Sequence, residues 1–185
     1  PWKTKVSAGT QGVATRVPEY VVNLQVGLRL RDRLEAMGAR VLMTRTTHDV
    51  NIANGDRARI MNAAGVQLLL SLHCDGNQNR SLNGLHTLIP AQRGYQQGDV
   101  LAESQRFARV MQEECIKGTG ARDKGFSTRG DLSSLNWAKM PTCLVEMGYM
   151  TNAAEDKRLV TAAYQDKLAA AMAKAVARYF TELAE

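Results

Sequence analysis

The stretch "VQLLLSLHCDG" (residues 66–76) decides the fold, because an almost unbroken apolar run ends there in polar residues. Such runs are typical of parallel strands that are covered on both faces. A second run of this kind, "TCLVEMGYM" (142–150), carries Glu146 as the first run carries His73. In open α/β sheets, ligands bind beyond the carboxyl ends of the strands. The two runs therefore predict two buried strands with a site at their ends.

Helix and strand patterns alternate around these two runs. Helical spacing of apolar residues occurs at 18–38, 51–65, 100–118 and 162–185, and further strand patterns occur at 39–44 and 84–90. We expect loops at 1–18 and at 119–140, a long polar segment of the kind that often borders a site. We find no repeat, linker or low-complexity tract. The sequence predicts a single α/β domain over 1–185, with a mostly parallel twisted sheet and helices on both faces.

Composition narrows the choice of partners. Of the 185 residues, 44% are hydrophobic and 23% charged, as in globular domains, and the formal net charge of +6 indicates an anionic partner. Nucleic acid, an acidic cell-wall polymer and an acidic peptide all fit that charge. Aromatic residues make up only 5% and do not alternate with basic ones, which argues against a platform for stacking single-stranded bases.

Other classes are also excluded. No apolar stretch is long enough to span a membrane, and no signal peptide opens the chain. The chain starts in loop-like sequence, which we interpret as a trimmed or mature part of a longer protein. Three cysteines, none at C-x-x-C spacing, indicate neither a disulfide framework nor a zinc knuckle.

Three residues at element ends are candidates for chemistry: Glu19 at a helix start, and His73 and Glu146 on the two apolar runs. A catalytic zinc site takes three protein ligands and keeps one position for water, and a nearby carboxylate can accept that water's proton. Plainer interpretations exist for each residue. His73 can be structural, Glu19 can favour the helix dipole, and Glu146 can pair with Arg45 or Arg57. Spacing alone does not decide between them.

Four pieces of sequence together carry a family resemblance. They are the glutamate that opens the first helix, "VLMTR" (41–45), "SLHCDGN" (71–77) and "VEMGYMTN" (145–152). The third is similar to an S-x-H-x-N/D segment and the fourth to an E-x-G-F-x-x-N segment. Each piece is weak, but all four in this order resemble the zinc-dependent N-acetylmuramoyl-L-alanine amidases of the Amidase_3 type. The resemblance runs from about residue 5 to residue 183.

The resemblance implies a function and a set of roles. Glu19 and His73 would be zinc ligands and Glu146 the catalytic carboxylate, for hydrolysis of the amide between N-acetylmuramic acid and L-alanine in peptidoglycan. It also implies action outside the cell, at the cell wall. The family has another zinc-binding histidine, in a Gly-rich segment before the position of Glu19, which neither His48 nor His86 matches. We expect that histidine, with the first strand of the sheet, to precede Pro1 in the parent protein.

Further residues near these motifs have two interpretations each. Arg45, Arg57 and Arg129 are candidates for binding acidic groups of the stem peptide, or they are solvated or ion-paired arginines. Asp75 and Asn77 either orient His73 or shape a turn after it.

Three other functions compete with a zinc amidase. The first is a non-catalytic peptidoglycan-binding or regulatory module of the same fold, which the missing histidine motivates. The second is a basic nucleic-acid-binding protein, which rests on charge alone. The third is a zinc carboxypeptidase that acts on stem peptides. We favour peptidoglycan over nucleic acid as the partner, while the oligomeric state stays open.

Overall fold

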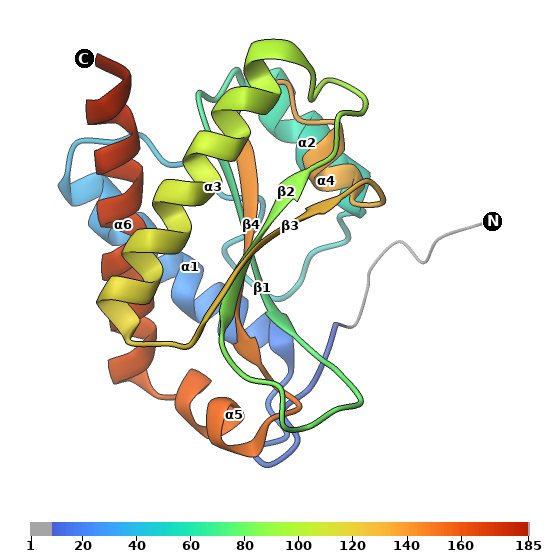
Figure 1. Ribbon diagram of the computed structural model, residues 1–185, viewed down its shortest axis with the longest axis vertical. Coiled ribbons are helices and arrows are strands. Elements are labelled where there is room, and N and C mark those ends of the chain that lie inside the picture. Colours follow the sequence, from blue (N-terminus) through green and yellow to red (C-terminus); the bar gives the residue numbers. More distant parts are fainter. Residues whose placement is uncertain (1–8, 185) are drawn as a thin grey trace.

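A four-stranded sheet with the order β1-β4-β2-β3 forms the centre of the molecule in this computed structural model, which describes residues 9–184 (Figure 1). The elements are α1 (Glu19–Ala36), α2 (Asn54–Ala64), β1 (Leu69–Asp75), β2 (Leu85–Pro90), α3 (Gly98–Thr119), β3 (Asp123–Arg129), α4 (Ser133–Asn136), β4 (Thr142–Tyr149), α5 (Ala153–Leu159) and α6 (Ala162–Ala184). β1 pairs with β4 and β2 with β3 in parallel, whereas β2 and β4 are antiparallel. The predicted α/β fold with a mostly parallel sheet is confirmed.

Helices cover the two faces of the sheet unequally. α1, α3 and α6 pack on one face, and the shorter α2 and α4 lie toward the other (Figure 1). Strand side chains alternate between these faces. Cys143, Val145 and Met147 of β4 therefore point into the larger core, while Leu144 joins the small core beside α4. The same alternation places Glu146 on the face that the long helices do not cover.

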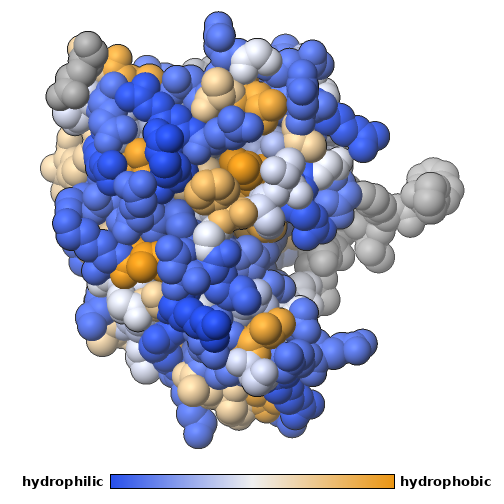
Figure 2. Space-filling model, in the orientation of Figure 1, coloured by the Kyte–Doolittle hydropathy of each residue, from blue (hydrophilic) through white to orange (hydrophobic). Residues whose placement is uncertain are grey.

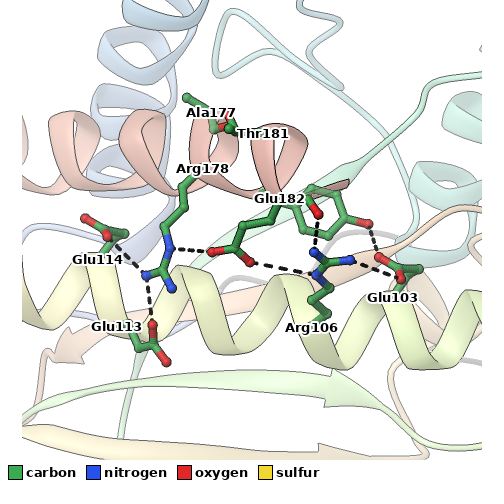
Figure 3. Close-up of polar contacts among 9 residues, drawn as sticks. Glu103, Arg106, Glu113, Glu114, Ala177, Arg178, Thr181 and Glu182 are labelled. Atoms are coloured by element: carbon green, nitrogen blue, oxygen red, sulfur yellow. Dashed lines mark hydrogen bonds and ion pairs between the residues drawn. The ribbon is translucent and has the colours of Figure 1, made fainter. Parts of the chain in front are cut away.

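Polar contacts reinforce the packing of α6 on α3. Arg178 pairs with Glu113, Glu114 and Glu182, and Tyr179 donates a hydrogen bond to Glu103 (Figure 3). Most of these side chains are partly exposed, so each pair contributes little, and the apolar contact between α3 and α6 dominates. The rest of the surface in the view of Figure 2 is largely hydrophilic, with hydrophobic residues in small separate groups.

Several local predictions are wrong or incomplete. Residues 39–44 form no strand and pair with no strand among residues 9–184, where β1 pairs with β4 alone. The segment 119–140, predicted as a loop, contains β3 and α4, and α5 was not predicted. Residues 9–18 form a loop as expected, whereas the part of that prediction on 1–8 lies outside the described residues. The strand expected before Pro1 stays a prediction.

One buried carboxylate fixes the loop that leads into α1. Asp156 is fully buried, and it accepts hydrogen bonds from the backbone N–H of Ala14 (2.7 Å) and Thr15 (2.8 Å) and from the Thr15 hydroxyl (2.5 Å). We expect Asp156→Ala to lower the free energy of unfolding by about 3 kcal/mol, because buried donors lose a charged acceptor. Urea denaturation would measure this change. Asp166→Ala is the control, since the half-exposed Asp166 pairs with Arg29 alone in the described part of the chain, and we expect less than about 1 kcal/mol there.

Candidate active site

A row of three polar side chains crosses the sheet. His73 of β1 is the register partner of Glu146 of β4, and Glu146 is in turn the partner of His86 of β2. Direct partners on neighbouring strands point to the same face of a sheet, so the row lies on the face opposite α1, α3 and α6. The apolar residues between these positions bury the strands and thereby fix the register of the row.

Glu19 joins this row from the first turn of α1. Its Oε1 atom lies 2.8 Å from Nδ1 of His73, and the side chain is almost fully buried. The N–H of Thr10 donates to Oε2 (2.9 Å), and Nδ2 of Asn23 donates to Oε1 (3.0 Å). Gly9 leaves room for the carboxylate, because a Cβ there would clash with it, and its φ of +71° suits glycine.

These contacts keep Glu19 ionised. Burial alone would raise the pKa of its carboxyl, but the hydrogen bond and charge of His73, with the Thr10 and Asn23 donors, lower that pKa to about 2. The result is a rigid carboxylate–imidazole pair at the end of β1.

Glu146 has the opposite electrostatics. Burial raises the pKa of its carboxyl to about 8, the charges of Asp75 and Glu19 add to the shift, and Arg129 opposes it. Its Oε2 atom is buried and has no hydrogen-bond partner among residues 9–184. No ion pair of the described residues includes Glu146, so the structure does not bear out the alternative of a structural pair with Arg45 or Arg57. Glu146 is thus a carboxyl group whose pKa lies far above that of an ordinary glutamate.

An open pocket of about 580 Å³ connects these groups. Its lining includes Thr10, Glu19, His73, Asp75, Asn77 and Glu146. The pocket lies beyond the carboxyl ends of β1 and β4, where α/β sheets place their ligands. The structure thus brings together the three residues that the sequence singled out, from segments far apart in the chain.

The three predicted arginines differ in their surroundings. Arg45 donates to the carbonyl oxygens of Tyr20 (2.6 Å) and Thr47 (3.2 Å), so its guanidinium is partly engaged by backbone. Arg57 is half-buried; burial lowers the pKa of its guanidinium, and the nearby charge of Glu19 raises it. Arg129 is exposed and makes a two-point ion pair with Asp131. Binding of substrate by these arginines stays a prediction.

The donors present suit zinc in kind but not in number. A carboxylate oxygen and an imidazole nitrogen are common zinc ligands, and Glu19 and His73 supply one of each. Residues 9–184 contain no group of three His, Cys, Asp or Glu side chains placed to hold a metal ion. Cys74 does not complete the set, because it is buried, burial raises the pKa of its thiol, and its Sγ lies near Asn23. A zinc site with three protein ligands would therefore need one donor more than this pair supplies.

His86 was set aside in the sequence because it matches no family motif, yet the structure places it beside Glu146. Its position inside a strand was predicted correctly. Which strand lies next to β2, and in which direction it runs, is not contained in the local sequence pattern.

The fold and the pocket define an α/β protein with an acid–base site at the ends of its parallel strands. The chain belongs to the Amidase_3 family, described as N-acetylmuramoyl-L-alanine amidase, whose model matches residues 4–178. It is 32% identical over 162 residues to N-acetylmuramoyl-L-alanine amidase LytC of Bacillus subtilis, covering 88% of this chain and 31% of that protein. It is also 32% identical over 170 residues to N-acetylmuramoyl-L-alanine amidase Rv3717 of Mycobacterium tuberculosis, covering 88% and 68%.

Solved structures agree with this assignment. An N-acetylmuramoyl-L-alanine amidase from Clostridium difficile 630 superposes with a TM-score of 0.85 at 25% identity, covering 95% of this chain and 90% of that one. Ami1 from Mycobacterium smegmatis gives a TM-score of 0.88 at 25% identity, covering 96% and 83%. The family and the fold are therefore shown by both sequence and structure.

Proposed function

We propose that this chain is a zinc-dependent amidase that hydrolyses the amide bond between N-acetylmuramic acid and L-alanine in peptidoglycan. One observation carries the proposal: a half-buried carboxyl with a raised pKa, that of Glu146, shares an open pocket with the Glu19–His73 pair. The family description and the names of the relatives support the choice of bond.

Each side chain then has a chemical task. Glu19 and His73 would hold zinc together with a third donor from outside the described residues. Bound zinc would supply Lewis acidity toward the scissile carbonyl. Glu146 accepts the proton of the attacking water and returns a proton to the leaving amine, tasks that suit a carboxyl whose pKa lies near neutrality. Arg57 and Arg129 add positive charge near the pocket for acidic groups of the stem peptide.

Peptidoglycan as substrate implies action at the cell wall or outside the cell. The formal net charge of +6 suits an acidic wall polymer. Among residues 9–184, no helix is both long and apolar enough to cross a membrane.

A non-catalytic wall-binding module is the second candidate, and one observation favours it: the described residues supply two metal donors rather than three. Zinc content separates the two candidates. We expect about one zinc per chain in parent protein purified without chelators, and its loss in the double variant Glu19→Ala, His73→Ala. His48→Ala is the control, because His48 is exposed and lies outside the pocket. A zinc-free parent protein would contradict the amidase mechanism.

The reaction itself is tested on purified peptidoglycan by mass spectrometry of the soluble products. An amidase releases stem peptides with a free N-terminal L-alanine and leaves the muramic acid carboxyl on the glycan. A carboxypeptidase instead releases single amino acids from the far end of the stem. Release of single amino acids alone would contradict the proposed bond.

A further inference from the structure

His86 occupies a well-defined position beside the site. Its side chain is only 14% exposed, and its ring stacks on Tyr149 with centroids 5.9 Å apart and an interplanar angle of 27°. Its Nε2 atom lies 3.7 Å from Oδ2 of Asp75, a pocket residue. The ring therefore reaches from β2 across β4 to the end of β1, and contacts on two sides restrict its orientation.

Two polar atoms in this region have no partner. Nδ1 of His86 and Oε2 of Glu146 are both buried and lack a hydrogen bond within residues 9–184. Buried polar atoms in native proteins are nearly always hydrogen-bonded to protein or to ordered water, so each unpaired atom requires an explanation. The two residues are direct partners on antiparallel strands, which places their Cβ atoms about 4.5–5.5 Å apart. One bridging water is enough to satisfy both atoms.

We propose that His86 is a positioning residue for Glu146, acting through one water that is hydrogen-bonded to both its Nδ1 atom and Oε2 of Glu146. The hydrogen-bonding roles of the His86 imidazole and the Glu146 carboxyl agree with this proposal. Because Nε2 faces the acidic Asp75, that nitrogen is the donor, which leaves Nδ1 to accept one hydrogen of the water while Oε2 of the Glu146 carboxylate accepts the other.

The consequence for the reaction rests on the proposed function. A carboxyl group that passes a proton from water to the leaving amine must keep its rotamer through both steps. The contact with His86 holds Oε2 of Glu146 in place, and the other carboxyl oxygen of Glu146 then faces the pocket. His86 thus acts through Glu146 and has no contact with substrate of its own.

Three substitutions distinguish the two nitrogens. His86→Asn keeps a polar atom near the position of Nδ1, His86→Gln keeps one near Nε2, and His86→Leu keeps neither. With peptidoglycan fragments as substrate, we expect kcat to fall about 10- to 100-fold in the Leu and Gln variants with KM changed less than about twofold. We expect the Asn variant to recover most of that loss. Recovery by Gln and not by Asn, or full activity of the Leu variant, would overturn the proposal.

A second measurement does not depend on activity. In zinc-free protein, the effects of His86→Leu and Glu146→Leu on urea unfolding are measured singly and together, because a water-mediated contact makes them non-additive. In a control double-mutant cycle, His48→Leu takes the place of His86→Leu, because His48 is exposed. We expect its effect on the unfolding free energy to add to that of Glu146→Leu. Additive effects in the His86 cycle would overturn the proposal. Coupling in that cycle, with no amidase activity in the wild type, would support the contact and refute the proposed function instead.

Discussion

Glu146→Gln is expected to lower kcat about 1,000-fold, within the range of losses seen when a general acid–base group is removed. The substitution keeps the size and shape of the side chain, but an amide neither accepts the proton of water nor donates one to an amine. Glu146 is half-buried and lines the pocket together with Glu19 and His73. Initial rates of stem-peptide release give kcat and KM for both proteins.

Two controls make this result specific. Zinc content and the urea midpoint of Glu146→Gln must stay close to or above those of the wild type, since Glu146 is not proposed as a metal ligand. Glu35→Gln carries the same chemical change on a half-exposed side chain of α1, away from the pocket, and we expect full activity. A Glu146→Gln protein that keeps more than a tenth of wild-type kcat would show that the proton is carried by another group.

The parts of the site on buried parallel strands could be predicted from sequence. Apolar runs that end in His73 and Glu146 identify β1 and β4, and a ladder between two such strands brings their ends together. Placing Glu19 against His73 required the family resemblance, because nothing in the helix pattern says which strand α1 approaches. The structure shows this contact at 2.8 Å.

The missed parts depend on contacts between distant segments. β3 is an exposed edge strand whose residues are mostly polar, so its pattern resembles that of a loop until β2 pairs with it. Residues 39–44 have a strand-like pattern, yet a strand needs a neighbour to accept its hydrogen bonds. His86 was missed for the same reason, since only the antiparallel pairing of β2 with β4 places it opposite Glu146.

The second large effect is expected in the stability of the zinc-free protein as pH changes. The pKa of the Glu146 carboxyl is raised from 4.5 to about 8 on folding. Below pH 4.5 both folded and unfolded chains hold this proton, and the full contribution to stability is present. Between pH 4.5 and 8 only the folded chain holds it, so stability falls as pH rises. Each pKa unit corresponds to about 1.4 kcal/mol, which gives a loss of up to about 5 kcal/mol over this range.

Glu19 acts with the opposite sign in a different range. Its folded pKa of about 2 lies below the ordinary value of 4.5 for a glutamate, so its contribution is present above pH 4.5 and is lost as pH falls toward 2. The two carboxyls together favour maximal stability near pH 4.5, with a falling limb on each side.

Paired variants isolate each limb, because all other titrating groups are common to wild type and variant. Urea unfolding is measured from pH 2 to pH 9 in the presence of a chelator. We expect the difference in unfolding free energy between Glu146→Gln and the wild type to grow by several kcal/mol from pH 4.5 to 8. The corresponding difference for Glu19→Gln should instead change below pH 4.5. Parallel curves for Glu146→Gln and the wild type would mean that Glu146 ionises normally in the fold, and its role as a proton carrier near neutral pH would lose its physical basis.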